Sequence, residues 1–550
     1  MKRLILFSFC LMMTMMSRAI WLESADFRVV CKDGSVTYFC GMGTDITFNE
    51  DGTILYIQTE WQNNVISYAV DGIEAIEFTR PGELYDSYDY VGAHIDVDFS
   101  ATDDSSFSEV EEKIVTNVNH DDYGDFIEFY KPTNTMIITY KEGSATYKKK
   151  PSGVTVNVSG NHVVVTSTVK NMAYMLEGAT TNGSFKLNSS NKAQINLNGV
   201  SITNPTGPAI NIQSGKTMLV NVADGTTNYL EDSEDEYQFT DKEDEAGEQK
   251  KGTFFSEGQL IFSGNGTLNV KSNYGHGIAS DDYVRMRADN MNITIDAVRD
   301  GISTKERFIM YGGELTINAG QDGVDVGEGY IEIGAGKLTV NAADEGIIAS
   351  YEGDEDTGVI DSLITPYIDI KGGLIKVTTT DDKGHGVRAM SAFSMSGGIV
   401  QVVTKGAGSK ALLAEGDMSL TGGKVTACTE GNALYEADVN DLSSSAAIRS
   451  KGTLTITDMT IGAKSIGTGS KGINNVGDIV MTNSRVTVVS SGGTHKQNGL
   501  DSRSRGVTSD GGLTIDGGSL LVRSYEEPLY LRGAHTFLNN AVYSGYQVGK

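Results

Sequence analysis

The chain has 550 residues, and its 72 acidic residues outnumber its 44 basic residues, which gives a formal net charge of −28. This excess argues against binding nucleic acid through its phosphates and against an anionic membrane surface, whereas it is compatible with metal cations or neutral sugars. Glycine is abundant (65 residues), proline is scarce (7), and hydrophobic residues make up 39% of the chain. Such a composition predicts a long apolar core with many turns.

The first 19 residues have the pattern of a secretory signal. Lys2 and Arg3 precede an apolar run, and Ser17 and Ala19 supply the small residues expected before a cleavage site after Ala19. The apolar run is too short to span a bilayer, and no later segment approaches the required length. We therefore expect an exported protein with no transmembrane segment, located at the cell surface, outside the cell or in the periplasm.

Residues 20–82 predict a small β module, and residues 83–153 predict an acidic linker followed by an N-terminal cap. The segments TYFCGMGTDITF (37–48) and SYAVDGIEAIEF (67–78) share one spacing of apolar residues, as expected of strands flanking a turn. A cap is required because the end of a stack of strands exposes unpaired backbone groups.

A short repeat dominates residues 154–550. Gly277, Gly301, Gly323 and Gly346 are spaced 24, 22 and 23 residues apart, and each is followed by an aliphatic residue. Between them lie segments with period-2 alternation joined by glycine turns, which is typical of a β solenoid. Leucine-rich repeats have a similar period, but their consensus segment is absent. The sequence therefore predicts an all-β fold, a parallel β-helix.

The register of this repeat follows from superposing the turn glycines Gly313, Gly336, Gly373, Gly398 and Gly423. The strands before the turn then contribute the apolar pairs Phe308/Met310, Ile331/Ile333, Ile368/Ile370, Phe393/Met395 and Met418/Leu420. The strands after the turn contribute Leu315/Ile317, Leu338/Val340, Ile375/Val377, Val400/Val402 and Val425/Ala427. Because residues two apart share one face of a strand, each pair is expected to stack on its counterpart one coil along.

Three insertions interrupt the period, at residues 224–250, 351–366 and 430–446. Insertions in a solenoid emerge at turns, where they often build a binding face. The acidic run at 231–248 is interpreted as a mobile loop rather than a site, and the acidic cluster at 354–356 as solvated surface.

The turn before each landmark glycine has the same length in three coils: DAVRDG (296–301), NAGQDG (318–323) and NAADEG (341–346). Equal lengths predict two columns of stacked side chains. Asp296, Asn318 and Asn341 would form a hydrogen-bonded ladder, and Asp300, Asp322 and Glu345 would form a carboxylate column.

Like charges about 4.8 Å apart repel by about 1 kcal/mol even in water, so the carboxylate column needs solvent screening, protonation or a cation. Asp325 and Asp344 lie beside it in the sequence and could complete an oxygen shell for Ca²⁺. The alternative is a solvated column, since Asp-Gly is a favourable turn dipeptide. Stacking alone is compatible with both.

At this point the sequence resembles a family of secreted bacterial carbohydrate-binding proteins, first catalogued as a domain of unknown function. The resemblance covers residues from about 150 to at least 440, and it rests on stretches such as KGTFFSEGQLIFSGNGTLNV (251–270), YGHGIASDDYVRM (274–286), RDGIST (299–304), QDGVDV (321–326) and ADEGIIASYEG (343–353). It implies a right-handed parallel β-helix akin to pectate lyases, with bound calcium and recognition of cellulose and acidic plant sugars. The matching positions are Asp300 and Asp322, with Glu345 beside Asp344, while His276 and His385 depart from the pattern.

Candidate sugar contacts are cationic and aromatic residues near these turns. Tyr274, Tyr283, Tyr351 and Tyr435 are expected to be exposed, where an aromatic face could cover a pyranose ring. The expected sugar-binding residues are Tyr274, His276, Arg299, Lys305 and Arg388. The cations among them could instead pair with the acids, which is the most frequent role of an arginine beside carboxylates, or act as a base.

The sequence therefore predicts a secreted, calcium-dependent, polysaccharide-binding β-helix without catalytic residues. One alternative is a calcium-dependent polysaccharide lyase that uses the same face, because calcium can acidify a uronate α-proton for a Lys or Arg base. A second is a cell-surface adhesin or structural spacer.

Overall fold

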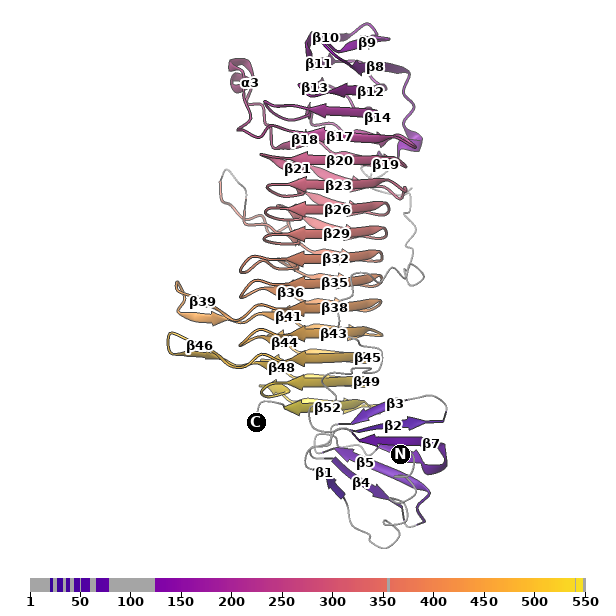
Figure 1. The fold of residues 1–550 in the computed structure, drawn as a ribbon, viewed down its shortest axis with the longest axis vertical. Helices are drawn as coiled ribbons and strands as arrows, with labels where there is room; N and C mark the ends of the chain where they lie inside the picture. The colour runs from indigo at the N-terminus through magenta and orange to yellow at the C-terminus, as the bar shows by residue number, and fades with distance from the viewer. Residues whose placement is uncertain are drawn as a thin grey trace. The chain divides into compact units, whose positions relative to one another are not determined.

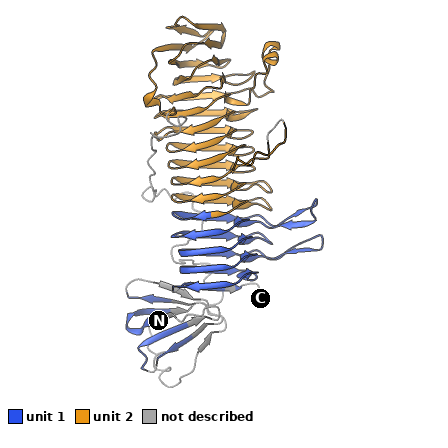
Figure 2. Cartoon of the chain, turned by 180° about the vertical axis from the view of Figure 1, so that it is seen from behind, with its two compact units in different colours: residues 1–98, 419–550 blue, residues 99–418 orange. Residues whose placement is uncertain are grey.

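The computed structural model describes residues 20–22, 27–32, 36–39, 44–49, 51–59, 66–78, 124–353, 357–539 and 541–547. The predicted signal (1–19), residues 83–123 of the predicted linker and the acidic cluster at 354–356 lie outside the described residues. The chain divides into two compact units, residues 99–418 and residues 1–98 with 419–550 (Figure 2). Within the described ranges, none of the helices has the length and apolar character needed to span a bilayer.

Residues 99–418 form an all-β unit whose strands stack in long parallel ladders (Figure 1). In its regular part each repeat supplies three strands, and each strand pairs in parallel with its counterpart one repeat along, as β24, β25 and β26 do with β27, β28 and β29. The long parallel sheets confirm the all-β class predicted from the sequence.

The first ladder contains β10 (Val154–Ser159), β11 (Asn161–Ser167), β13 (Gly183–Ser189), β15 (Ile210–Gln213), β18 (Gly252–Ser256), β21 (His276–Ser280), β24 (Ile302–Thr304), β27 (Val324–Val326), β30 (Ile347–Ala349), β33 (Val387–Ala389) and β36 (Lys410–Ala414). The second contains β12 (Met172–Thr180), β14 (Ala193–Thr203), β16 (Met218–Val222), β19 (Leu260–Gly264), β22 (Tyr283–Met286), β25 (Arg307–Met310), β28 (Tyr330–Ile333), β31 (Ile368–Ile370) and β34 (Phe393–Met395). The third contains β17 (Thr227–Glu231), β20 (Thr267–Ser272), β23 (Asn292–Ala297), β26 (Glu314–Ala319), β29 (Lys337–Ala342), β32 (Leu374–Thr379) and β35 (Ile399–Thr404). β37 (Met418–Leu420) lies at the boundary between the units.

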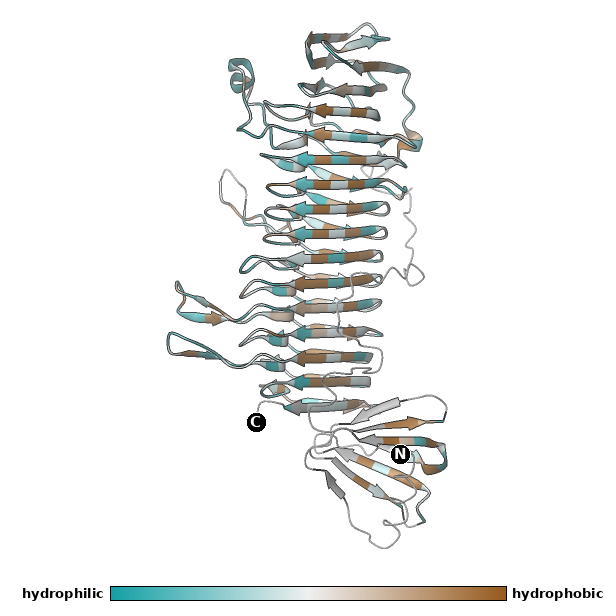
Figure 3. Cartoon of the chain, viewed as in Figure 1, coloured by the Kyte–Doolittle hydropathy of each residue, from teal (hydrophilic) through white to brown (hydrophobic). Residues whose placement is uncertain are grey.

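The predicted register is confirmed where pairings are described in this unit. Phe308 and Met310 pair with Ile331 and Ile333, and these continue to β31 and β34. Leu315/Ile317 likewise stack on Leu338/Val340, and the column continues through β32 and β35. These side chains are almost fully buried, and the colours of Figure 3 alternate along the strands accordingly. Each such buried aliphatic side chain contributes about 1.5–3 kcal/mol of transfer free energy.

The glycine turns between the second and third ladders have a conformational cause. Gly313 has a φ of 77°, and Gly336 has a φ of 92°. L-residues with a side chain rarely adopt this left-handed region, so glycine recurs at this turn of each repeat.

Parallel stacking begins earlier in the chain than Val154. β8 (Asn134–Tyr140), which lies inside the segment predicted as linker and cap, pairs in parallel with β12. β9 (Thr146–Lys148) and β10 close this end as antiparallel partners of β8 and β11. A short 3-10 turn, η4 (Ile127–Phe129), precedes β8.

The predicted insertion at 224–250 is shorter than expected, because its first part forms β17. Asn228 and Leu230 point inward, and β17 pairs with β14 and β20. The remainder carries α3 (Asp241–Ala246), with Thr240 and Glu243 forming a capping box at its start. It is therefore a folded insertion, unlike the mobile loop predicted from its acidic sequence.

The other unit contains the predicted N-terminal module. One antiparallel sheet consists of β1 (Ile20–Leu22), β4 (Thr44–Phe48), β5 (Ile54–Thr59) and β6 (Ile66–Ala69), and a second of β3 (Val36–Phe39), β2 (Phe27–Cys31) and β7 (Ile73–Phe78), with the 3-10 turn η1 (Val70–Gly72) before β7. Val29, Ile46, Leu55, Ile57 and Ile73 form its buried core.

Residues 419–550 of the same unit again form parallel ladders. One contains β41 (Ala446–Ser450), β44 (Lys471–Asn475), β48 (Arg505–Ser509) and β50 (Leu529–Leu531). The others contain β38 (Lys424–Thr429), β42 (Leu454–Thr457), β43 (Thr460–Ser465), β45 (Ile479–Ser490), β49 (Leu513–Ser524), β51 (His535–Leu538) and β52 (Val542–Gln547). Two hairpins project from this region, β39 (Leu434–Glu436) with β40 (Asp441–Ser443) and β46 (His495–Gln497) with β47 (Leu500–Ser502).

Candidate functional site

The corner that leads from the third ladder into the first brings acidic side chains together. The amide of Gly301 donates to the carbonyl of Asp322 (2.9 Å), and the amide of Gly323 donates to the carbonyl of Glu345 (2.9 Å). Asp300, Asp322 and Glu345 therefore lie in successive layers, as the equal turn lengths predict. We call the residues that precede the landmark glycines, from His276 to His385, the corner column.

The landmark glycines are required by close packing. A Cβ on Gly301 would lie 2.2 Å from Cγ2 of Ile317, and one on Gly323 would lie 2.2 Å from Cγ1 of Val340. Real side chains do not approach so closely, so any larger residue would push the corner away from the core. This packing holds the preceding carboxylates at a constant position from layer to layer.

Side chains of the corner column also bind the backbone of the next layer. The amide of Asp322 donates to Oδ1 of Asp300 (3.0 Å), and the amide of Glu345 donates to Oδ1 of Asp322 (2.8 Å). The neighbouring ladder predicted for Asp296, Asn318 and Asn341 is present, with amide-to-oxygen distances of 2.6 and 2.9 Å. Each aspartate of the corner column thus has a structural bond through one oxygen.

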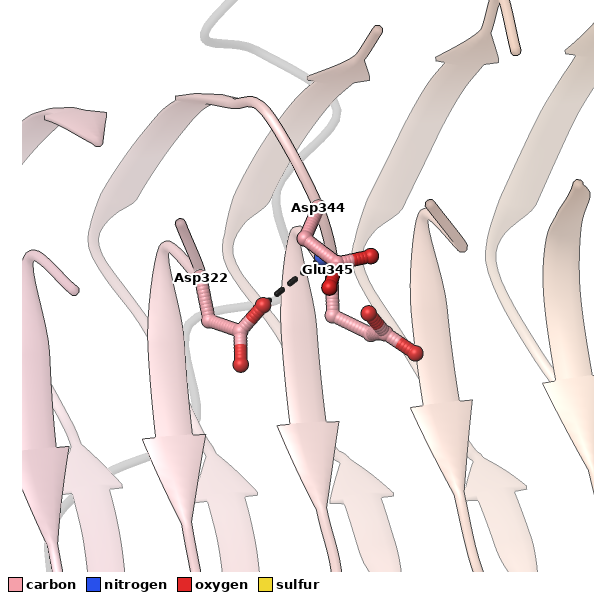
Figure 4. Close-up of side chains that lie close together, drawn as sticks. All are labelled: Asp322, Asp344 and Glu345. Carbon is pink, nitrogen blue, oxygen red and sulfur yellow. Dashed lines mark hydrogen bonds between the residues drawn. The ribbon is translucent and has the colours of Figure 1, made fainter. Parts of the chain in front are cut away.

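Three carboxylates lie close together at this corner (Figure 4). One oxygen each of Asp322, Asp344 and Glu345 lies within 4.8 Å of the others. Glu345 is buried, Asp322 is half-buried, and Asp344 is exposed to solvent. Asp300 is buried one layer away, and Asp325 lies on the outward face of β27. The structure therefore gathers all five predicted metal ligands at one corner, and three of them meet.

The crowding changes the proton affinity of these groups. Burial, together with the charges of Asp300 and Asp325, raises the pKa of Asp322 to about 8. Burial and the charge of Asp300 raise the pKa of Asp325 to about 7. Burial and neighbouring Asp344 raise the pKa of Glu345 to about 8, although Arg388 acts in the opposite direction. At neutral pH the protein alone therefore holds this cluster with less than its full charge.

Three of the five predicted sugar-binding residues line one cavity of about 190 Å³. Tyr274, His276 and Arg299 contribute one wall together with Gly275, and the folded insertion contributes the other through Glu236, Tyr237, Phe239, Lys250 and Lys251. We call this cavity the insertion pocket. Nδ1 of His276 also lies 2.9 Å from Oδ2 of Asp300, so the insertion pocket adjoins the corner column.

The other two predicted residues lie elsewhere. Lys305 follows β24 at the opposite end of that strand and pairs with Glu328 (3.1 Å). Arg388 extends from β33 toward the carboxylates, and its Nη1 donates to Oε1 of Glu345 (2.9 Å). Arg388 is therefore placed beside the three carboxylates rather than in the insertion pocket.

One expected aromatic contact is wrong. Tyr283 is only 3% exposed, because it begins β22, its ring lies under Arg307 and its hydroxyl donates to Asp125. The hydroxyl of Tyr351 donates to the carbonyl of Val359 within the second insertion, and that of Tyr435 donates to Asn440 in the hairpin β39–β40.

Sequence reasoning missed the wall of the insertion pocket that comes from the insertion. Its residues stand in an acidic run, which favoured an interpretation as mobile surface. The available signal was the presence of Tyr237 and Phe239 within that run and of the pair Lys250–Lys251 just after it, since aromatic and basic residues there are unexpected for a solvated acidic loop.

Comparisons with known proteins show what this chain is similar to. A solved structure of the polysaccharide lyase-like protein from C. thermocellum, a gadolinium derivative, aligns with a TM-score of 0.38 and 24% identity, over 44% of this chain and 91% of that one. A curated carbohydrate-binding domain-containing protein of Acetivibrio thermocellus is 30% identical over 102 residues, which make up 18% of this chain. The match spans about a third (34%) of that relative's length. The family model of the carbohydrate-binding domain-containing proteins matches residues 159–466, more than half of the chain, which therefore belongs to this family.

Proposed function

We propose that this protein is a secreted, calcium-dependent polysaccharide-binding protein that performs no catalysis and recognises plant-type or acidic glycans. Its scaffold in this proposal is a right-handed parallel β-helix, with three strands in each coil. It acts at the cell surface, outside the cell or in the periplasm. Membership of a carbohydrate-binding family supports the class of ligand.

The donor set of the corner fits calcium. Ca²⁺ prefers six to eight oxygen ligands at about 2.3–2.6 Å, so two oxygens that share one ion lie no more than about 5 Å apart. The oxygens of Asp322, Asp344 and Glu345 satisfy this limit at 4.8 Å. Bound calcium would balance the negative charge of these carboxylates. Because Asp344 is exposed, the ion could reach the site from solvent.

The observation that carries the proposal is the continuity between this cluster and the insertion pocket. His276 contacts Asp300, Asp300 accepts from the amide of Asp322, and Asp322 accepts from the amide of Glu345. Neutralising the carboxylates therefore orders the same corner that presents Tyr274, His276 and Arg299. This linkage makes sugar binding depend on calcium.

The test is binding to insoluble polysaccharides in calcium and in chelator. We expect wild-type protein to bind in calcium and to be released by chelator. The double variant Asp322→Asn with Asp344→Asn should lose calcium stoichiometry in equilibrium dialysis and lose retention. The control double variant Asp501→Asn with Asp510→Asn removes two exposed carboxylates elsewhere and should behave as wild type. Unchanged calcium stoichiometry in the first variant would refute the site.

The same preparations distinguish a polysaccharide lyase. Arg388, 2.9 Å from Glu345, is the cation that such an enzyme would use beside the carboxylates. A calcium-dependent rise in absorbance from an unsaturated uronate product, lost in Arg388→Ala, would replace the non-catalytic proposal with the lyase.

A further inference from the structure

The insertion pocket has the dimensions of one sugar ring. Its volume of about 190 Å³ is below the roughly 300–1,000 Å³ of pockets that hold drug-sized ligands. One wall is the corner of the stacked strands and the opposite wall is the folded insertion that carries α3. A cavity of this volume is compatible with one ring, so the rest of a polymer would lie outside it.

Aromatic side chains supply apolar surface on both walls. The rings of Tyr237 and Tyr274 lie 5.0 Å apart between centroids, tilted by 56°. Phe239, from the insertion, is 40% exposed, and Nζ of Lys250 lies 4.4 Å from its ring centroid. Such rings pack against the apolar faces of pyranoses, while neighbouring polar groups bind the hydroxyls.

A buried carboxylate fixes the insertion in place. Asp232 is 2% exposed and accepts hydrogen bonds from the hydroxyls of Tyr237 and Ser272 and from the amides of Asn273 and Gly275. A Cβ on Gly275 would lie 2.4 Å from the Tyr237 hydroxyl, so glycine is needed for this approach. The two walls are therefore held together before any ligand arrives.

The lining of the insertion pocket contains one carboxylate, that of the exposed Glu236, and three cations, Lys250, Lys251 and Arg299. Lys250 pairs with Glu243 (3.1 Å), and Lys251 pairs with Asp281. Arg299 is exposed, and its guanidinium lies 5.4 Å from the centroid of Tyr274. Among the described residues, no carboxylate forms an ion pair with Arg299. A guanidinium offers two parallel N–H donors that match a carboxylate.

We infer that the insertion pocket binds the terminal residue of an acidic polysaccharide. The ring of that residue packs on Tyr274 and Phe239, and its carboxylate pairs with Arg299. This inference rests on the proposed function and adds to it that a chain end, rather than an internal segment, is recognised.

The test is calorimetric titration in calcium with trigalacturonate, and with cellotriose as the neutral probe. Arg299→Gln should weaken trigalacturonate binding at least tenfold and leave cellotriose binding unchanged, whereas Phe239→Ala should weaken both. Arg503→Gln, which removes an exposed arginine charge in residues 419–550, should bind as wild type. Equal trigalacturonate affinity of Arg299→Gln and wild type would overturn the inference.

Recognition of a chain end is tested separately, by varying the length of the polysaccharide. Polygalacturonate of two chain lengths, compared at equal mass, should bind protein in proportion to the number of chain ends. Binding that is independent of chain length would overturn the terminal assignment. If wild type binds polygalacturonate in calcium while Arg299→Gln leaves every affinity unchanged, the insertion pocket is not the sugar-binding site, but the proposed function stands. If wild type retains no polysaccharide in calcium, the proposed function fails, and the trigalacturonate titration still decides the insertion pocket.

Discussion

At the scale of single residues, the acidic side chains of the corner column accept a hydrogen bond from the next layer and also lie close to other carboxylates. Asp300 and Asp322 each use one oxygen to accept the amide of the next layer, so a short side chain with an acceptor is needed there. Histidines replace the acids at its ends: His276 contacts Asp300, and Nδ1 of His385 accepts the amide of Lys410 (3.2 Å). The acidic stretch is thus confined to three layers, where the carboxylates can share a cation.

The landmark glycines predict a sharp difference between two similar substitutions. Gly301→Ala would place a Cβ 2.2 Å from Ile317, whereas a Cβ on Gly327 has no heavy atom within 4 Å. Neither glycine has a positive φ, so the comparison isolates packing. We expect Gly301→Ala to lower the free energy of unfolding by about 1–3 kcal/mol through overpacking, and Gly327→Ala to have little effect. Denaturant titration measures both, and equal effects would contradict the packing explanation.

At the scale of elements, the local sequence pattern was enough to predict the strands of the regular repeats and their partners. Period-2 alternation placed Leu315 and Ile317 on one face, and superposed turns predicted their partners Leu338 and Val340. Both inferences need only the strand period and the repeat length, which the sequence displays directly.

The irregular elements could not be derived in the same way. The insertion is folded by Asp232, whose partner Ser272 lies 40 residues away in the next layer. Burial of Tyr283 depends on Asp125, 158 residues away in sequence. Contacts of this kind have no periodic signature, so the sequence showed an acidic loop and an exposed tyrosine where the structure has an ordered pocket wall and a buried ring.

The role of Asp232 in holding the folded insertion in place can be tested by substitution. Asp232→Ala would leave the Tyr237 and Ser272 hydroxyls and two amides without their acceptor, and a buried unsatisfied group costs about 1–3 kcal/mol. We expect the insertion to detach while the parallel ladders stay folded, which limited proteolysis would detect as new cleavage at Lys242 and Lys250. Asp235→Ala, at an exposed position nearby, is the control. Wild-type protease resistance in Asp232→Ala would show that other contacts hold the insertion.

At the scale of the whole molecule, the carboxylates behind the net charge of −28 differ in how strongly their surroundings affect them. Among the described residues, the buried acids are Asp125, Asp232, Asp300 and Glu345, and the remaining carboxylates are at least partly exposed to solvent, which screens them. Asp322 and Glu345 of the corner column differ from these exposed groups, because burial raises their pKa values to about 8. The pH dependence of stability should therefore contain a contribution from this corner.

The sign of that contribution follows from linkage. Unfolded Asp and Glu titrate near their ordinary values of 3.8 and 4.5, so between about pH 4 and about pH 8 Asp322 and Glu345 bind more protons in the folded protein than in the unfolded chain. The contribution of these two groups to stability therefore falls as pH rises through this window. Calcium bound as proposed would replace protons on the ionised carboxylates, so its stabilising effect should grow over the same window.

Thermal unfolding at about pH 5 and about pH 8.5, in calcium and in chelator, measures this effect. We expect calcium to raise the Tm more at the higher pH. The double variant Asp322→Asn with Glu345→Gln should lose the pH-dependent part of the calcium effect, because its corner no longer gains charge in this range. The variant removes only two of the 28 net negative charges, so general repulsion is nearly unchanged. A calcium effect that is equal at both pH values in wild type would place calcium binding, if present, away from Asp322 and Glu345.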